Sequence, residues 1–234
     1  SGYSGHYALN FFTNMVAWGA AKVLALSFRP MRDDPKRKIK VVPPLLRPEV
    51  LSLRRADGTD DPAVRDGGYI HGYMLNAGFS QDVLEWHSAH PDVPLRFFWD
   101  RADEAPVKVV DETLSFYYLN DEEFLRQMAG CHAYASTAGF ESVCEAMYLG
   151  KPLLMVPSHV EQKCNAYDAT EGYRMDCGAV DGVKENGSVP RPAVTSDSFD
   201  LDLLLHFADN EFVADKSFPQ WARLADSVFL KELT

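Results

Sequence analysis

The sequence lacks the features that mark membrane-spanning, secreted or disulfide-stapled proteins. No uninterrupted apolar run approaches the ~20 residues of a transmembrane helix, and no signal peptide with an apolar centre and a cleavage site is visible. The chain has only 4 cysteines, and none of them stands in CxxC spacing. We therefore expect reduced thiols in a cytoplasmic protein, with neither disulfides nor a cysteine-bound metal.

Positive charge is scarce and unevenly distributed. The chain has 23 Lys and Arg against 34 Asp and Glu, a net charge of −11, yet residues 1–55 carry +7 and the remainder carries −18. The acidic balance and the lack of a recognisable binding motif argue against a nucleic-acid partner. The basic residues from Arg29 to Lys40 could attract anionic lipid at the inner face of a membrane or an acidic acceptor, or they could belong to a solvated loop.

Residues 137–166 form the most informative stretch of the sequence. Thr137-Ala138-Gly139 is expected to open a helix whose free N–H groups and positive dipole end can hold a diphosphate without a metal ion. Ser142, one turn into the helix, adds a hydroxyl donor. Glu145 lies about one and a half turns beyond Gly139, where its carboxylate could accept both hydroxyls of a ribose. Because the neighbours of Glu145 are apolar, its side chain must either reach solvent or have a partner.

A turn and a short strand follow this helix. Gly150-Lys151-Pro152 ends the helix, and residues 153–156 are expected to form a buried strand that stops at Pro157. The loop with Glu161 and Gln162 then emerges at the carboxyl edge of a parallel sheet. Ligands of open α/β sheets bind at that edge. Asn165 is a further candidate for donor binding, although Gln162 and Asn165 could instead cap the helix that Glu161 begins.

Together these residues follow the pattern G-x-x-S-x-x-E-x-x-x-x-G-x-P-x-x-x-x-P-x-x-x-[DE]-Q-x-x-N-A. The pattern resembles the donor-binding signature of GT-B glycosyltransferases. It is similar to the UDP-glycosyltransferases of plants and animals, and to the bacterial enzyme that adds N-acetylglucosamine to the peptidoglycan lipid intermediate. The resemblance implies that Gly139 and Ser142 contact the diphosphate, Glu145 the ribose, and Glu161 with Gln162 the donor sugar. Thr137 stands where the eukaryotic families have a phosphate-binding His.

Two further loops are expected at the same edge of the sheet. Asn76-Ala77-Gly78 follows a strand, and its glycine would let the backbone approach a phosphate, although this is also ordinary turn chemistry. Residues 118–121 follow another strand and include a helix cap, Asn120 or Asp121. In the family this loop lies against the nucleotide base, which assigns a base contact to Leu119 or its backbone.

Strands and helices alternate from residue 69 onward. Strands are expected at 69–75, 95–99, 114–119 and 133–136, and helices at 80–90 and 121–129. This rhythm predicts an α/β fold, a Rossmann-like parallel sheet with helices on both faces.

The first part of the chain is expected to be organised differently. Residues 7–20 should form a helix, 22–28 a strand, and the proline-interrupted residues 41–48 an extended linker. The resemblance implies that residues 1–48 are the end of a GT-B N-terminal acceptor domain with the interdomain linker, and residues 49–234 the nucleotide-sugar-binding domain. Most of the acceptor domain would then lie on a missing segment or a partner chain.

The implied reaction is transfer of a sugar, of hexosyl type, from a nucleoside diphosphate sugar, with UDP as the expected nucleotide. The acceptor is unknown and could be lipid-linked or a glycan. We find no Asp-x-Asp metal motif in the sequence, so we expect a metal-independent enzyme without a cofactor, in which helix amides stabilise the leaving diphosphate. No residue can be assigned as the catalytic base. A sugar-nucleotide 2-epimerase and a non-catalytic donor-binding subunit that needs a partner chain remain alternatives.

Overall fold

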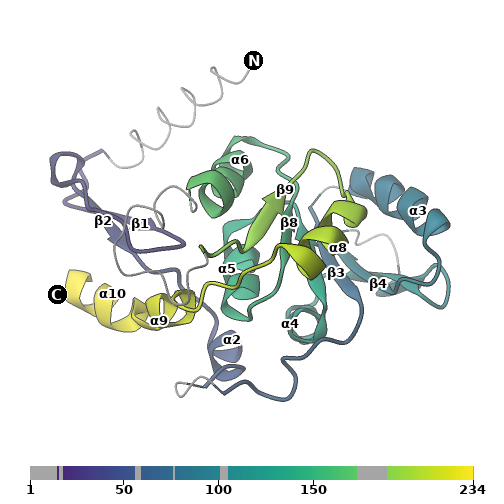
Figure 1. Ribbon diagram of the computed structural model, residues 1–234. Helices are drawn as coiled ribbons and strands as arrows, with labels where there is room; N and C mark the ends of the chain where they lie inside the picture. The colour runs from purple at the N-terminus through teal and green to yellow at the C-terminus, as the bar shows by residue number, and fades with distance from the viewer. Residues whose placement is uncertain are drawn as a thin grey trace.

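A seven-stranded sheet forms the centre of the protein. The computed structural model describes residues 15, 18–55, 59–75, 77–100, 105–172 and 189–233. Within these residues the strand order is β5-β6-β4-β3-β7-β8-β9 (Figure 1). All neighbouring strands are parallel except β5 and β6, which are antiparallel. The strands are β3 (Ile70–Met74), β4 (Leu95–Trp99), β5 (Val107–Val109), β6 (Leu114–Tyr118), β7 (Ala133–Ser136), β8 (Leu153–Met155) and β9 (Ala193–Thr195).

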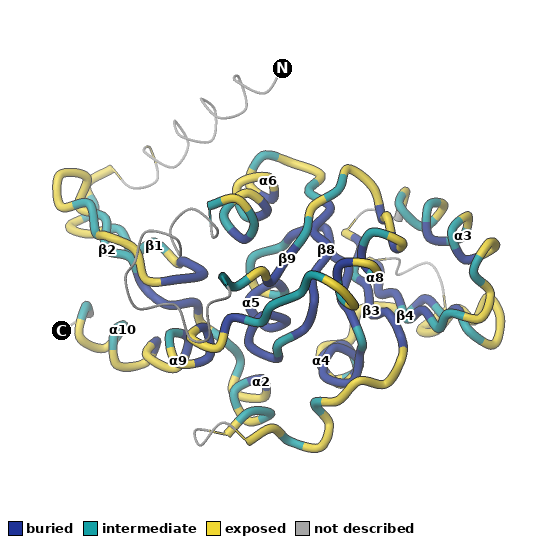
Figure 2. Tube along the Cα trace, viewed as in Figure 1, coloured by how far each residue is buried: buried dark blue, intermediate teal, exposed yellow. Residues whose placement is uncertain are grey.

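Helices cover both faces of this sheet, and each face has its own apolar core. The first core packs α4 (Asp121–Gly130), α5 (Phe140–Tyr148) and α9 (Phe218–Arg223) against one face. The second core packs α3 (Ser80–Ala89) and α8 (Leu201–Asn210) against the other. Figure 2 shows the central strands buried between these layers. The predicted α/β sheet with helices on both faces is confirmed.

The remaining elements lie at the periphery. They are η1 (Pro35–Arg37), α2 (Pro48–Ser52), η2 (Ala77–Phe79), α6 (Val160–Tyr167), the π-helical turn η3 (Asp168–Gly172) and α10 (Ala225–Leu233). A separate pair of parallel strands, β1 (Val23–Leu26) and β2 (Ile39–Val42), packs beside α10 at the left of Figure 1. Lys22 forms an ion pair with Glu232 there, which joins the first strand pair to the C-terminal helix.

The first part of the chain requires two corrections. Val41 and Val42, predicted to begin an extended linker, belong to β2, where they pair with Ala25 and Leu26. Apolar β-branched side chains suit a paired strand, and Pro43 ends it because proline has no N–H to donate. The helix predicted for residues 7–20 lies mostly outside the described residues, and its described end at residues 18–20 is a turn with Gly19 at φ 81°.

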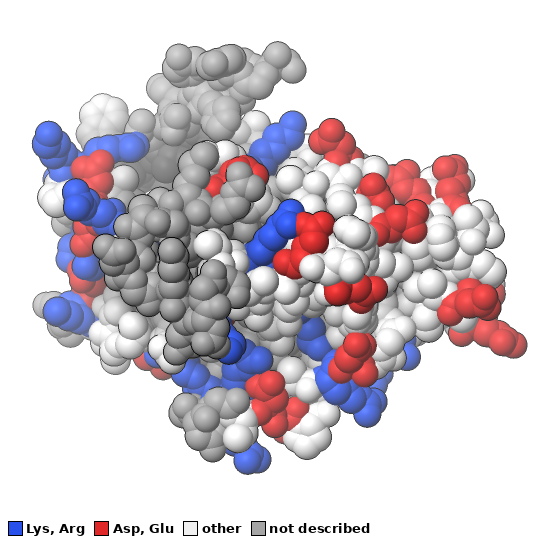
Figure 3. Space-filling view, in the orientation of Figure 1, with Lys and Arg blue, Asp and Glu red and all other residues white. Residues whose placement is uncertain are grey.

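The basic residues near the N-terminus are only partly available to a partner. Arg29 is buried, and its Nη1 lies 2.6 Å from Asp168 Oδ1, while Lys40 Nζ lies 2.8 Å from Asp33 Oδ2. The loop residues Arg32, Lys36, Arg37 and Lys38 are exposed. On the face in Figure 3, basic side chains appear around β1 and β2, whereas acidic ones predominate over α3 and α8.

Gly72 in β3 offers a test of this packing. A methyl group at this position would lie 2.1 Å from the ring of Phe97 on β4, and both residues are buried in the middle of the sheet. We expect Gly72→Ala to lower the free energy of unfolding by about 1–3 kcal/mol, measured by urea denaturation. The wild type is the reference, and a Gly72→Ala variant as stable as the wild type would contradict the packing around Gly72.

Candidate functional site

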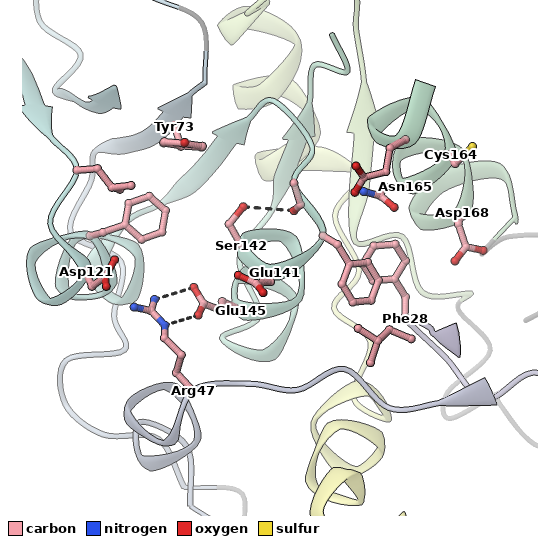
Figure 4. A pocket seen from close by; sticks show the side chains of 16 residues that line it. Phe28, Arg47, Tyr73, Asp121, Glu141, Ser142, Glu145, Cys164, Asn165 and Asp168 are labelled. Carbon is pink, nitrogen blue, oxygen red and sulfur yellow. Dashed lines mark hydrogen bonds and ion pairs between the residues drawn. The ribbon is translucent and has the colours of Figure 1, made fainter. Parts of the chain in front are cut away.

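The main cavity lies where the sheet's carboxyl edge meets the helices that follow it. Its volume is about 870 Å³, and α4, α5 and α6 form three of its walls (Figure 4). Leu26 and Phe28, at and after the end of β1, and Arg47, just before Pro48, complete the lining. It is lined by Leu26, Phe28, Arg47, Tyr73, Leu119, Asp121, Phe124, Gly139, Phe140, Glu141, Ser142, Glu145, Glu161, Cys164, Asn165 and Asp168. The sequence predicted a ligand site at this edge.

The turn between β7 and α5 presents a helix N-terminus to the cavity. Gly139 is the N-cap of α5, and among the described residues no side chain caps this helix end. Its uncapped amides and the positive end of the helix dipole favour an anion. Ala138 just before it has φ 62°, a strained conformation for a residue with a Cβ. Asn165 Nδ2 donates a hydrogen bond of 3.1 Å to the Ala138 carbonyl, which fixes the turn to α6.

Ser142 occupies the first turn of α5, and its side chain faces the cavity. Its Oγ lies 3.4 Å from the Gly139 carbonyl (Figure 4). This distance is long for a hydroxyl hydrogen bond. The Ser142 hydroxyl can therefore turn to a ligand in the cavity at little cost.

Glu145 has a partner that the sequence did not identify. Arg47 donates two hydrogen bonds to its carboxylate, Nε to Oε1 at 2.7 Å and Nη2 to Oε2 at 2.9 Å. Arg47 lies at the start of α2, 98 residues away along the chain. Burial raises the pKa of Glu145, and the hydrogen bonds and charge of Arg47 oppose that rise. The two residues therefore form a bidentate ion pair on the cavity wall.

The residues expected near the donor sugar are only partly at the cavity. Glu161 and Asn165 line it. Gln162 is buried away from it, because its Oε1 accepts hydrogen bonds from the backbone N and the Oγ of Ser158 at 2.8 and 2.7 Å. Gln162 thus stabilises the loop before α6. The alternative that Gln162 and Asn165 cap this helix is not confirmed either, because the N-cap of α6 is His159 and no described side chain caps this helix end.

Of the other predicted site residues, some line the cavity and others do not. Leu119 lines the cavity, and the adjacent Asn120 caps α4 by accepting a hydrogen bond of 2.9 Å from Glu123 N, as predicted. Thr137 is buried outside the cavity lining, and its Oγ1 accepts a hydrogen bond of 3.4 Å from Leu75 N. Gly78 lies in η2 and does not line the cavity. Asn76 is outside the described residues.

Carboxylates dominate the charge of the cavity. Among its described lining residues, Arg47 is the single cation, against the acidic residues Asp121, Glu141, Glu145, Glu161 and Asp168. Arg29, just behind the wall, is paired with Asp168. Because Arg47 is itself paired with Glu145, an anionic ligand must rely mainly on the α5 amides for compensation.

The acidic residues do not form a metal site in the part of the chain that the structure describes. Among those residues, no group of three or more His, Cys, Asp or Glu side chains could hold a metal ion. The expectation that the sequence has no Asp-x-Asp motif needs a correction, because Asp200-Leu201-Asp202 has this spacing. Asp200 caps α8 by accepting a hydrogen bond of 2.9 Å from Leu203 N, and Asp202 lies near His90. This tripeptide is therefore away from the cavity and serves the helix start.

Several lining residues were not predicted from sequence. They come from the end of β1 and the residues after it, from β3, from the residue before α2 and from the start of η3, and include Phe28, Tyr73 and Asp168. These segments are distant from the signature in sequence, and only the fold brings them to the cavity. The signal for Arg47 was indirect, since the apolar neighbours of Glu145 implied a partner without naming it.

The sheet topology is that of a GT-B glycosyltransferase, with a cavity at the carboxyl edge of the sheet. The family model for glycosyl transferase family 1 matches residues 7–187. The chain therefore belongs to glycosyl transferase family 1. A search of the curated proteins found no match.

Solved structures of glycosyltransferases share the fold. The glycotransferase of kitacinnamycin is 18% identical with a TM-score of 0.54, over 86% of this chain and 50% of its own. The calicheamicin glycosyltransferase CalG4 is 17% identical with a TM-score of 0.53, over 94% and 57%. UGT89C1 of Arabidopsis thaliana, complexed with UDP, is 17% identical with a TM-score of 0.51, over 85% and 52%. The chain thus spans about half the length of these proteins.

A membrane-spanning segment was not expected from sequence. Within the described ranges, no helix combines the length and the apolar character that crossing a bilayer requires.

Proposed function

We propose that the cavity binds a UDP-linked sugar and that this chain supplies the donor half of a hexosyl transfer. The observation that carries the proposal is the convergence of three features on one cavity: the uncapped N-terminus of α5, the Ser142 hydroxyl and the Glu145 carboxylate. The first two suit a diphosphate and the third suits a ribose. The relative from Arabidopsis thaliana, described as complexed with UDP, supports the choice of nucleotide.

Each wall of the cavity would contact a different part of the UDP-sugar. The α5 amides and Ser142 would stabilise the negative charge that develops on the diphosphate as the sugar leaves, a form of preorganised electrostatic stabilisation. Glu161 and Asn165 on the α6 wall would face the sugar hydroxyls. Leu119, which is 37% exposed, would lie against the base. The base that deprotonates the acceptor, and the site that binds the acceptor, would come from the other half of the enzyme.

Nucleotide selectivity tests the proposal directly. We expect UDP and UDP-sugars to bind at least about tenfold more tightly than ADP or GDP. The proposed base site beside Leu119 should accept uracil but not a larger purine base. Isothermal titration calorimetry with the purified chain measures the dissociation constants. Comparable affinity for all three nucleoside diphosphates, or no binding of UDP, would refute the proposal.

We also propose that donor binding is independent of metal ions, because the amides at the N-terminus of α5 can compensate the diphosphate charge. Addition of EDTA during the UDP titration should leave the dissociation constant unchanged. A large loss of affinity in EDTA that Mg²⁺ or Mn²⁺ restores would show that the acidic cavity needs a cation. Asp200→Asn is the control for the Asp-x-Asp tripeptide. The Asp200 carboxylate caps α8 outside the cavity, so this variant should bind UDP as the wild type does, with or without EDTA.

A donor-binding subunit that requires a separate acceptor chain is the second candidate. The chain matches only about half the length of the solved glycosyltransferases. Hydrolysis or transfer of UDP-sugar by the chain alone, compared with the chain plus a supplied acceptor domain, separates the two candidates. Turnover by the chain alone would eliminate the subunit hypothesis.

A further inference from the structure

Arg47 and Glu145 form the only ion pair in which both partners line the cavity within the described chain. The side chain of Glu145 is 7% exposed and that of Arg47 is 35% exposed. Both hydrogen bonds run along one side of the carboxylate. An ionised carboxylate has about four lone-pair sites, so the bidentate pair leaves acceptor positions open.

The surroundings of Glu145 would otherwise disfavour its charge. Asp121 on α4 and Glu141 on α5 add negative potential, and both raise its pKa together with burial, which is the largest cause. The neighbouring Cys144 thiol on α5 and the Tyr134 hydroxyl on β7 are buried and neutral. A buried carboxylate without a compensating cation takes up a proton. Arg47 is the group in this environment that opposes that uptake.

Protonation would matter for a ribose ligand. A neutral carboxyl group donates one hydrogen bond and loses part of its acceptor capacity, whereas two ribose hydroxyls need two acceptors. Hydrogen bonds to an ionised acceptor are also roughly twice as strong as those between neutral groups. The value of Glu145 for a nucleotide therefore depends on its charge and on a fixed orientation.

We propose that Arg47 is a positioning residue for the nucleotide ribose: its guanidinium holds the Glu145 carboxylate ionised and oriented so that both ribose hydroxyls find acceptors. This inference rests on the proposed function. It also gives the segment between β2 and α2 a part in donor binding, because Arg47 enters the cavity from that segment. A displacement of this segment would remove the cation from Glu145 and weaken the ribose site.

The chain offers a matched control for an ion pair of similar geometry. Arg54 also makes a bidentate contact, from Nε to Asp60 Oδ1 at 2.7 Å and from Nη2 to Oδ2 at 3.3 Å. Neither Arg54 nor Asp60 lines the cavity. Arg54→Ala therefore removes a comparable pair without touching the proposed site.

The test compares UDP with 2′-deoxy-UDP from about pH 5 to about pH 9, across the range in which a raised carboxyl pKa would titrate. Titration of the phosphates is common to both ligands, so the ratio of their dissociation constants reports the ribose contact. In the wild type this ratio should be large and should fall only at low pH. In Arg47→Ala the UDP affinity near neutral pH should drop by roughly tenfold or more, and the pH midpoint of the ratio should move upward.

Arg47→Gln is the second variant, because it removes the charge while filling similar space, and circular dichroism checks the fold of each protein. It should show the same upward shift of the midpoint, whereas Arg54→Ala should match the wild type. An unchanged midpoint in both Arg47 variants would overturn the positioning role while the proposed function stands. Failure of the wild type to bind UDP would instead refute the proposed function itself.

Discussion

Glu145→Ala is expected to weaken the binding of UDP by roughly ten- to a hundredfold, because hydrogen bonds to a charged group contribute on the order of 1.5–3 kcal/mol. The structure adds a reason to expect a folded variant. Arg47, which loses its partner, has a side chain that is 35% exposed and can turn toward solvent. Calorimetry gives the dissociation constants, and urea denaturation gives the stability of the variant.

The ligand 2′-deoxy-UDP provides the control for this prediction. The wild type should discriminate against it, and Glu145→Ala should bind it and UDP with similar affinity. Glu145→Gln keeps one acceptor oxygen and should fall between the two proteins. Equal discrimination by the wild type and the alanine variant would place the ribose contact elsewhere and would leave Glu145 as a purely structural partner of Arg47.

The interior of the sheet could be predicted from sequence because its strands are short apolar runs between polar turns. Residues 95–99 and 133–136 form β4 and β7 with the expected bounds. Parallel strands buried on both faces leave this pattern in a sequence. The helices 80–90 and 121–129 were likewise predicted to within one residue at either end.

Elements at the edges of the structure left weaker patterns. All three residues of β5 are exposed, so no burial pattern marks the strand. Strand β9 also has only three residues. The pairing of Val41 and Val42 with β1 was missed because the prolines that follow them suggested an extended linker. Tertiary pairing decides the structure of such short segments more than local propensity does.

In the candidate site, too, the features that depend on local sequence could be predicted, and the contacts between distant segments could not. The signature helix, its glycine and the cavity wall at Glu161 and Asn165 follow from local spacing, and the structure brings them together. Gln162 has the right spacing but satisfies its own loop instead. The partnership of Arg47 with Glu145 spans 98 residues, and no local pattern encodes a contact between segments that only the fold makes neighbours.

Gly139→Asp is expected to change stability and binding in opposite directions. Asp is a favourable N-cap, and its replacement of the N-cap glycine of α5 should raise the free energy of unfolding by a few tenths of a kcal/mol. The same carboxylate would occupy the helix amides and place a negative charge where the diphosphate is proposed to bind. UDP binding should therefore fall by more than about a hundredfold, since both a lost anion contact and a new repulsion act on the ligand.

Two variants at the same position separate these causes. Gly139→Asn can cap the helix without a charge, so it should weaken UDP binding less than Gly139→Asp does, and its effect should change little with salt. Gly139→Ala neither caps nor adds charge, and its methyl group fits 3.9 Å from Ser142 Oγ, so it should retain most of the affinity. Because screening weakens repulsion between charges, added NaCl should recover part of the loss in Gly139→Asp alone. If Gly139→Asp binds UDP as the wild type does, the diphosphate does not lie at the N-terminus of α5.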